Sequence, residues 1–118
     1  MNRAVFFDRD GVLNKLVKRD NGLYSPRDIN SFKLINGASN TIQSIKAKGY
    51  LCIVISNQPD VARGTLKRSV LNNMTKILNE KLELDDVYYC LHDDPDDEGC
   101  RKPAPGMIID AQKKWNID

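Results

Sequence analysis

Residues 4–14 read AVFFDRDGVLN, and this stretch sets the expectations for the rest of the chain. Its first four residues are all apolar, and such a run favours a strand covered on both faces, as in a parallel sheet. The run ends at two acids, Asp8 and Asp10, and Gly11 follows them. Functional residues in open parallel sheets gather beyond the carboxyl ends of the strands. The two acids therefore lie where a site is expected.

The remainder of the chain alternates between strand-like and helix-like segments. Two further apolar runs predict strands, over Tyr50 to Ile55 and over Val87 to Cys90. Helices are predicted over Ala38 to Lys48, after Gly64 with Thr65 as a possible N-cap, and from Pro105 onward with Met107, Ile108, Ala111 and Trp115. Residues 14–36 are polar and are expected to be irregular. This order predicts an α/β fold in which helices cover both faces of a parallel sheet.

Length and composition narrow the class of protein. The chain has 118 residues, which suits a single domain over residues 1–118. Its 18 basic and 16 acidic side chains give a net charge of +2, which favours neither nucleic acid nor a membrane as partner. It has no apolar run of about 20 residues and no signal-peptide pattern. We therefore expect a cytoplasmic protein whose cysteines, Cys52, Cys90 and Cys100, are reduced.

Each predicted strand ends at groups that suit phosphoryl chemistry. The first ends at Asp8 and Asp10, the second at a hydroxyl and an amide, and the third is followed by a basic pair. Two close carboxylates can stay ionised beside Mg²⁺, and hydroxyl, amide and lysine groups can bind phosphoryl oxygens. Any one of these features alone also fits a solvated turn, a loop start or a surface basic pair. Their occurrence at three successive strand ends favours phosphate-ester hydrolysis.

The same segments resemble a known superfamily. FFDRDGVLN, VISNQ and CRKPAPGM resemble three signatures of the haloacid dehalogenase superfamily of phosphohydrolases. DRDGVLN, SNQPDVARG, YYCLH and CRKPAPGM resemble the subfamily of histidinol-phosphate phosphatase and D-glycero-D-manno-heptose 1,7-bisphosphate phosphatase. The resemblance covers nearly the whole chain. It implies a three-layer α/β/α fold without a cap domain, since only 45 residues separate Asp10 from Ser56 and a loop and a helix use them.

The resemblance also implies roles for particular residues. Asp8 would be the nucleophile and a Mg²⁺ ligand, and Asp10 the general acid and base, with its backbone carbonyl on the metal. Ser56 and Asn57 would hold the transferring phosphoryl group. Lys102 would neutralise its charge and steady Asp8.

Substrate contacts follow from the resemblance as well. Arg63 and Arg101 lie where the heptose enzymes contact substrate, and the loop from Gly22 to Asp28 would shape specificity. A heptose bisphosphate is the first expectation for this small phosphorylated substrate, and histidinol phosphate is the alternative. The sequence does not indicate an oligomeric state.

Two departures from the family pattern stand out. The fourth signature, an acidic strand end that completes the Mg²⁺ site, is absent, since neither Asp110 nor Asp118 follows an apolar run. This suggests a C-terminally truncated piece or a product that lacks one metal ligand. Cys90, His92 and Cys100 resemble a loop zinc site, but Glu98 occupies the position of a further cysteine. A zinc site and a loop with two free thiols both remain open. We expect the neighbouring acids to be solvated: Asp93, Asp94, Asp96 and Asp97.

Two other classes of protein fit parts of the pattern. A receiver-type signalling domain also has clustered acids and a lysine before a proline. It would need a phosphorylated Asp at the end of its third strand, and this chain has none there. A non-catalytic domain with a phosphatase shape is supported only by the missing fourth signature.

Overall fold

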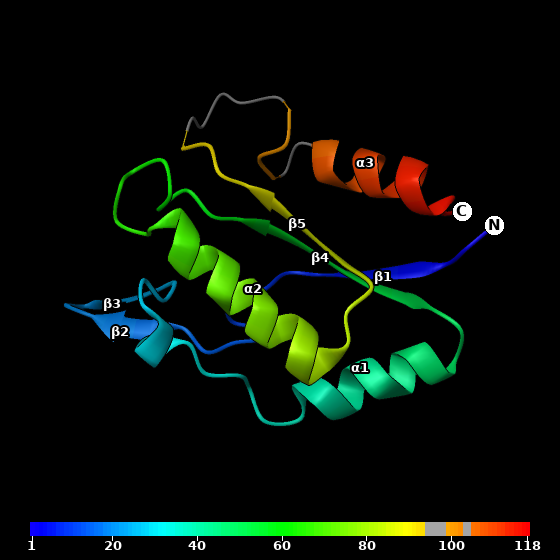
Figure 1. Cartoon of the computed structure of the whole chain (residues 1–118), viewed down its shortest axis with the longest axis horizontal. Helices are drawn as coiled ribbons and strands as arrows, with labels where there is room; N and C mark the ends of the chain where they lie inside the picture. Colours follow the sequence, from blue (N-terminus) through cyan, green and yellow to red (C-terminus); the bar gives the residue numbers. More distant parts are fainter. Residues whose placement is uncertain (94–98, 103–104) are drawn as a thin grey trace.

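The computed structural model describes residues 1–93, 99–102 and 105–118. Its main sheet contains β1 (Ala4–Phe7), β4 (Leu51–Asn57) and β5 (Asp86–Cys90) in the order β1-β4-β5. Both pairs in this sheet are parallel, so the predicted parallel α/β fold is confirmed. All three strands run in the same direction and end at one edge of the molecule (Figure 1).

Three helices cover the two faces of this sheet. Helices α1 (Ala38–Ala47) and α2 (Arg68–Leu82) lie on one face, and α3 (Gly106–Trp115) lies on the other (Figure 1). Because side chains alternate along a strand, β4 supplies both cores. Cys52 and Val54 pack in the cluster with α1 and α2, whereas Ile53 packs with α3. Burial of each such apolar side chain stabilises the fold by about 1.5–3 kcal/mol.

The predicted helices are present, with corrections at their ends. After α1, Gly49 adopts a φ of +90°, as a C-terminal glycine favours. The prediction of Thr65 as the N-cap of α2 is wrong, because α2 begins at Arg68 and Lys67 takes the N-cap position. The Thr65 backbone N–H and hydroxyl instead donate to the Asp60 carbonyl, 3.0 and 3.3 Å away, which closes a turn before the helix. On α3, Ile108 is 41% exposed and lies outside the buried stripe of Met107 and Ala111.

The segment expected to be irregular contains a small hairpin. Strands β2 (Val17–Arg19) and β3 (Gly22–Tyr24) pair antiparallel, and a short 3-10 helix, η1 (Ile29–Ser31), follows. Asp20 takes a φ of +50° in the turn, a conformation that aspartate tolerates better than most residues. The Arg19 guanidinium lies 4.9 Å from the Tyr24 ring centroid and donates to the Ser25 carbonyl. These contacts hold together strands too short to be recognised by periodicity.

The two ends of the chain meet beside β1. Asn2 and Ile117 form a parallel bridge, in which the Asn2 N–H donates to Asn116 and the Asp118 N–H donates to Asn2. Residues 116–118 therefore run parallel to the start of the first strand. None of the helices in the described part of the chain has the length and apolar character needed to cross a membrane.

Candidate active site

The carboxyl ends of the strands bring a lysine to the first aspartate. Lys102 Nζ lies 3.2 Å from an oxygen of Asp8, which directly follows β1, and it also donates to the Ile55 carbonyl at 3.3 Å. The Asp8 side chain is 52% exposed, so a substrate can reach its carboxylate. An accessible carboxylate beside a lysine is a suitable nucleophile for an anionic phosphoryl group, because the lysine offsets the approaching charge.

Asn57, at the end of β4, holds the backbone of Lys102. Its Oδ1 accepts from the Lys102 N–H at 2.9 Å, and its Nδ2 donates to the Lys102 carbonyl at 3.3 Å. Both polar ends of this side chain are therefore used to fix the loop after β5. The role of Asn57 in contacting phosphate stays a prediction, while its contact with Lys102 is a structural one.

Asp10 sits in a nearly complete shell of hydrogen-bond donors. Its carboxylate accepts five hydrogen bonds from the side chains of Arg9, Asn14, Ser25 and Gln58, at 2.7–3.1 Å. The side chain is only 11% exposed. Burial alone raises the pKa of Asp10, but the charge of Arg9 and the hydrogen bonds from Asn14, Arg9 and Gln58 outweigh it. The pKa of Asp10 therefore lies below its ordinary value, and the carboxylate is ionised.

Arg9 is a charged residue at the centre of the core. It is 0% exposed, and its guanidinium lies 5.3 Å from the Phe32 ring centroid and 5.7 Å from that of Tyr89. A buried guanidinium is costly unless its charge and donors are satisfied. Asp10 balances the charge, with one carboxylate oxygen 3.1 and 2.8 Å from Nε and Nη2, and Nη1 donates to the Tyr89 hydroxyl at 3.5 Å. Arg9 and Asp10 thus stabilise each other's charge.

Ser56 is less accessible than a phosphate contact suggests. It is 1% exposed, and its hydroxyl accepts from Gln58 Nε2 at 2.9 Å. The same Gln58 nitrogen donates to Asp10 at 2.7 Å. Gln58 therefore links the predicted phosphate-binding hydroxyl to the predicted acid and base.

The donor set suits a magnesium ion. Asp8 offers an exposed carboxylate, whereas the Asp10 carboxylate is already surrounded by donors. Among the hydrogen bonds of residues 1–93, 99–102 and 105–118, none uses the Asp10 backbone carbonyl oxygen. Mg²⁺ prefers oxygen ligands and keeps several waters, so the Asp8 carboxylate and the Asp10 carbonyl fit it. The assignment of these two groups as magnesium ligands stays a prediction.

The two predicted substrate arginines share one acid. Arg63 Nη2 and Arg101 Nη1 lie 2.6 and 3.3 Å from the same oxygen of Asp93. The hydrogen bond from Arg63 is the main cause of a lowered pKa for Asp93. The structure thus brings Arg63 and Arg101 together, on the loops that follow β4 and β5.

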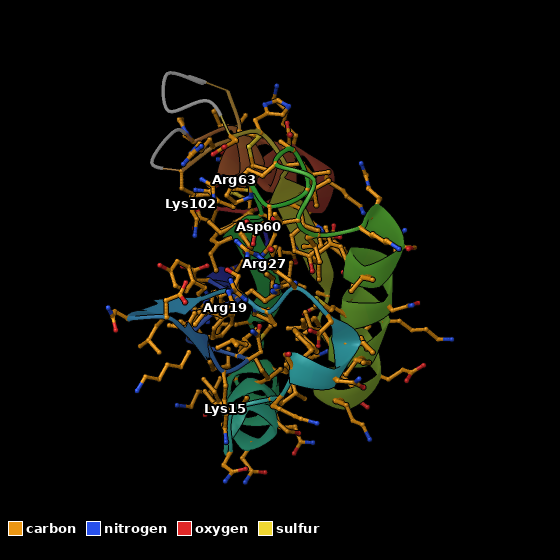
Figure 2. All side chains as sticks on the ribbon, turned by 90° about the vertical axis from the view of Figure 1, so that its left-hand side faces the viewer. Lys15, Arg19, Arg27, Asp60, Arg63 and Lys102 are labelled. Atoms are coloured by element: carbon orange, nitrogen blue, oxygen red, sulfur yellow. A yellow bond between two sulfur atoms is a disulfide. The ribbon has the colours of Figure 1, made fainter. Side chains whose placement is uncertain are left out.

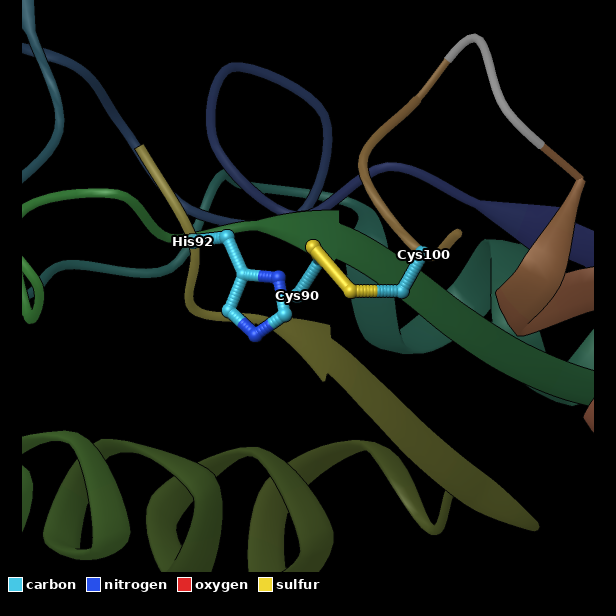
Figure 3. Close-up of side chains that lie close together, drawn as sticks. All are labelled: Cys90, His92 and Cys100. Carbon is cyan, nitrogen blue, oxygen red and sulfur yellow. A yellow bond between two sulfur atoms is a disulfide. The ribbon is translucent and has the colours of Figure 1, made fainter. Parts of the chain in front are cut away.

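The cysteine prediction needs a correction. Cys90 and Cys100 form a disulfide, so the expectation that both are reduced is wrong for this structure, and only Cys52 is free among the described residues (Figure 3). The ligand atoms of Cys90, His92 and Cys100 do lie within 4.8 Å of one another, as the zinc interpretation requires. Two sulfurs bonded to each other cannot supply the thiolates that zinc prefers. The set therefore does not fit zinc in this state. Glu98, with Asp94, Asp96 and Asp97, lies outside the described residues.

Four site residues were missed by sequence reasoning: Arg9, Asn14, Ser25 and Gln58. All four donate to Asp10. Arg9 and Asn14 lie inside the DRDGVLN motif. The position of Arg9 between two acids, directly after a buried strand, could have indicated that it binds one of them. Ser25 carried no such signal, because it reaches Asp10 only through the hairpin fold.

Comparison with known proteins places these features in a family. A model of the polynucleotide kinase 3 phosphatase family matches residues 3–117. A D-glycero-beta-D-manno-heptose-1,7-bisphosphate 7-phosphatase of Pasteurella multocida is 36% identical, with 100% of this chain and 67% of the relative covered. The enzyme of the same name from Haemophilus influenzae is 33% identical with the same coverage.

A solved structure agrees with this relationship. The D,D-heptose 1,7-bisphosphate phosphatase of B. bronchiseptica, complexed with magnesium and phosphate, superposes with a TM-score of 0.82 at 25% identity. The match covers 98% of this chain and 65% of that one, so the chain spans about two thirds of the length of its relatives. The chain therefore belongs to the haloacid dehalogenase superfamily of phosphatases, in the subfamily of the heptose bisphosphate phosphatases.

Proposed function

We propose that this site hydrolyses phosphate monoesters through an aspartyl-phosphate formed on Asp8. The observation that carries the proposal is the ion pair between Lys102 and the exposed Asp8 carboxylate at the end of β1. A carboxylate in this position can attack phosphorus, and the adjacent ammonium group offsets the negative charge that this attack brings together.

In the first step, an oxygen of Asp8 bonds to phosphorus while the bond to the leaving oxygen breaks. Asp10 gives its proton to that oxygen, which leaves as an alcohol. The donors around Asp10 favour its ionised form. An approaching phosphate carries like charge, which raises the pKa of a nearby carboxyl group and so favours the protonated form that this step needs.

In the second step, water attacks the phosphorus of the aspartyl-phosphate. Asp10 takes a proton from this water, and inorganic phosphate leaves while Asp8 is regenerated. The Asp8 carboxylate and the Asp10 carbonyl would hold Mg²⁺, which when bound supplies positive charge to the phosphoryl oxygens. Lys102 supplies further positive charge, and Asn57 keeps Lys102 in reach by binding its backbone.

We propose a sugar bisphosphate, of the heptose 1,7-bisphosphate type, as the substrate. The identity of 36% to a heptose bisphosphate phosphatase supports this choice, as does the cluster of Arg63 and Arg101 near the site. The family model is named for a polynucleotide phosphatase, but a net charge of +2 supports a small substrate over nucleic acid.

A phosphate-release assay with Mg²⁺ tests the proposal. It should compare D-glycero-D-manno-heptose 1,7-bisphosphate, histidinol phosphate and an oligonucleotide 3′-phosphate. We expect the bisphosphate to give the highest kcat/KM. Release only from histidinol phosphate or the oligonucleotide would overturn the substrate, and no release from any ester by a folded protein would overturn the hydrolase.

A further inference from the structure

We propose that Arg27 and Arg63, held in place by Asp60, form a subsite for a second anionic group of the substrate. This inference rests on the proposed function, because it concerns the part of the substrate that is not hydrolysed. The sequence predicted Arg63 and Arg101 as substrate-binding residues, and the proposal adds Arg27 as a further contact and Asp60 as the residue that positions it.

The two arginines border one cavity. Its volume is about 260 Å³, and it is lined by Leu16, Leu23, Tyr24, Ser25, Arg27, Pro59, Asp60 and Arg63. Ser25 connects this cavity to the reaction centre, since its hydroxyl donates to Asp10 at 2.9 Å. A substrate group in the cavity would therefore lie one side chain away from the predicted acid and base.

Asp60 anchors both arginines from the buried side of the cavity. It is 6% exposed, and its two oxygens lie 3.3 Å from Arg27 Nε and 3.5 Å from Arg63 Nη1. Arg27 comes from the segment after the hairpin, and Arg63 from the turn after β4 (Figure 2). One buried carboxylate thus contacts two guanidinium groups from distant parts of the chain, and Asp93 holds Arg63 more closely, at 2.7 and 2.6 Å from its Nε and Nη2.

The Nη1 and Nη2 donors of Arg27 make no hydrogen bond within the described part of the chain. Its side chain is 36% exposed, and it bonds to Asp60 through Nε. A guanidinium has five N–H donors in a planar fork that suits the bidentate recognition of phosphate and carboxylate.

Charge in this cluster also favours an anion. Three guanidinium groups, of Arg27, Arg63 and Arg101, share two carboxylates, of Asp60 and Asp93. Among the described residues, these five side chains carry one net positive charge, and Lys102 lies near them, paired with Asp8 (Figure 2). A second phosphate would neutralise this excess, whereas a substrate with one phosphate would leave it unused.

A different role is possible for the same contacts. The Arg27–Asp60 pair joins the hairpin region to the turn after β4, and this could serve only to hold the hairpin against the site. If the pair only holds the hairpin, its loss would lower activity on every substrate equally, because Ser25 would move away from Asp10. An anion subsite affects only substrates that carry a second anionic group, and this difference makes the proposal testable.

The experiment compares heptose 1,7-bisphosphate with the same heptose carrying only the 7-phosphate. In an Arg27→Met variant, the kcat/KM ratio of bisphosphate to monophosphate should fall by about tenfold or more, through KM, because charge-assisted hydrogen bonds are lost. Lys18→Met, an exposed cation on the same hairpin, serves as the control and should leave the ratio unchanged. An equal loss for both substrates, or no loss for either, would overturn the subsite.

Asp60 is tested as a positioning residue. Asp60→Asn should raise KM for the bisphosphate more than for the monophosphate, and Asp60→Glu should restore part of the difference. If the unmodified chain releases phosphate from neither sugar, the proposed function fails, and calorimetric binding of the bisphosphate decides the subsite. Binding about tenfold weaker in Arg27→Met than in Lys18→Met would then support it. Equal binding by the two variants would overturn it.

Discussion

Two loops bring charged groups to Asp8, and they are held in different ways. The turn over residues 8–14 is part of the core, where Arg9 and Asn14 are both 0% exposed and both bind Asp10. In the described part of the loop after β5, the ties include the contact of Asn57 with Lys102 and the Cys90–Cys100 disulfide. The first loop therefore depends on folding of the whole domain. The described part of the second loop is attached at separate points instead.

Substitution of Asp8, to which both loops bring charged groups, should have the largest effect on activity. Asp8→Asn keeps the size of the side chain but removes the carboxylate nucleophile, so kcat for phosphate release should fall by at least about 10³-fold. Asp110→Asn, an exposed acid on α3, is the matched control and should retain full activity. An Asp8→Asn variant that keeps most of the activity would contradict the assignment.

Measurements of the free energy of unfolding test whether the first loop is part of the core. Arg9→Met leaves the buried Asp10 carboxylate without its cation, which should lower the free energy of unfolding by about 3–5 kcal/mol in urea denaturation. Arg68→Met, at the exposed start of α2, should stay within about 0.5 kcal/mol of the unmodified protein. The contrast between the loops would break down if both variants were equally stable.

Loss of one contact in the second loop should lower the free energy of unfolding by less. Cys100→Ser removes a crosslink between residues 10 positions apart, which should lower the free energy of unfolding by about 2–3 kcal/mol. Dithiothreitol should produce the same loss in the unmodified protein and none in the variant. Without reductant, the denatured protein should show one reactive thiol, that of Cys52. Three thiols with one equivalent of zinc would instead support the metal interpretation of Cys90, His92 and Cys100.

Substitution of Asp86, which lies outside both loops, should have the smallest effect on the free energy of unfolding. Burial raises the pKa of Asp86, but hydrogen bonds from Trp115, Lys114 and the Val87 N–H outweigh it, so the net pKa lies below its ordinary value. The ionised form then stabilises the fold above the ordinary pKa, and this contribution is lost as the pH falls through the lowered one.

Asp86→Asn should therefore destabilise the protein by about 1 kcal/mol at pH 7, with the difference shrinking below about pH 4. Denaturation of both proteins between pH 3 and pH 7 measures this, and a difference that grows on acidification would oppose it.

The same contrast explains how far the sequence could be interpreted. Strong apolar runs, such as residues 51–55, made the parallel sheet predictable, and Asp8 was proposed as a site residue because it directly follows such a run. The role of Lys102 was inferred from the resemblance of CRKPAPGM to a family signature. The hairpin was missed because strands of three residues have too few positions to show alternation. Arg27 and Asp60 could not be paired from the sequence, since 33 residues separate them and only the fold brings them together.

The start of α2 was misplaced for a related reason. Thr65 has the chemistry of an N-cap, but its hydroxyl is used by the turn that begins at Asp60. The disulfide was unexpected because the prediction considered only the cellular compartment. The register of β5 and the return of the loop bring the two cysteine Cα atoms to 5.4 Å, a separation that permits a bond.

The central claim is that Asp8 carries the phosphoryl group during turnover. The direct measurement is rapid acid quenching during Mg²⁺-dependent hydrolysis of ³²P-labelled bisphosphate, followed by peptide mapping by mass spectrometry. We predict label on the peptide that contains Asp8, and none in the Asp8→Asn variant. Release of phosphate with label on another residue, or with no labelled protein at any quench time during turnover, would contradict the account.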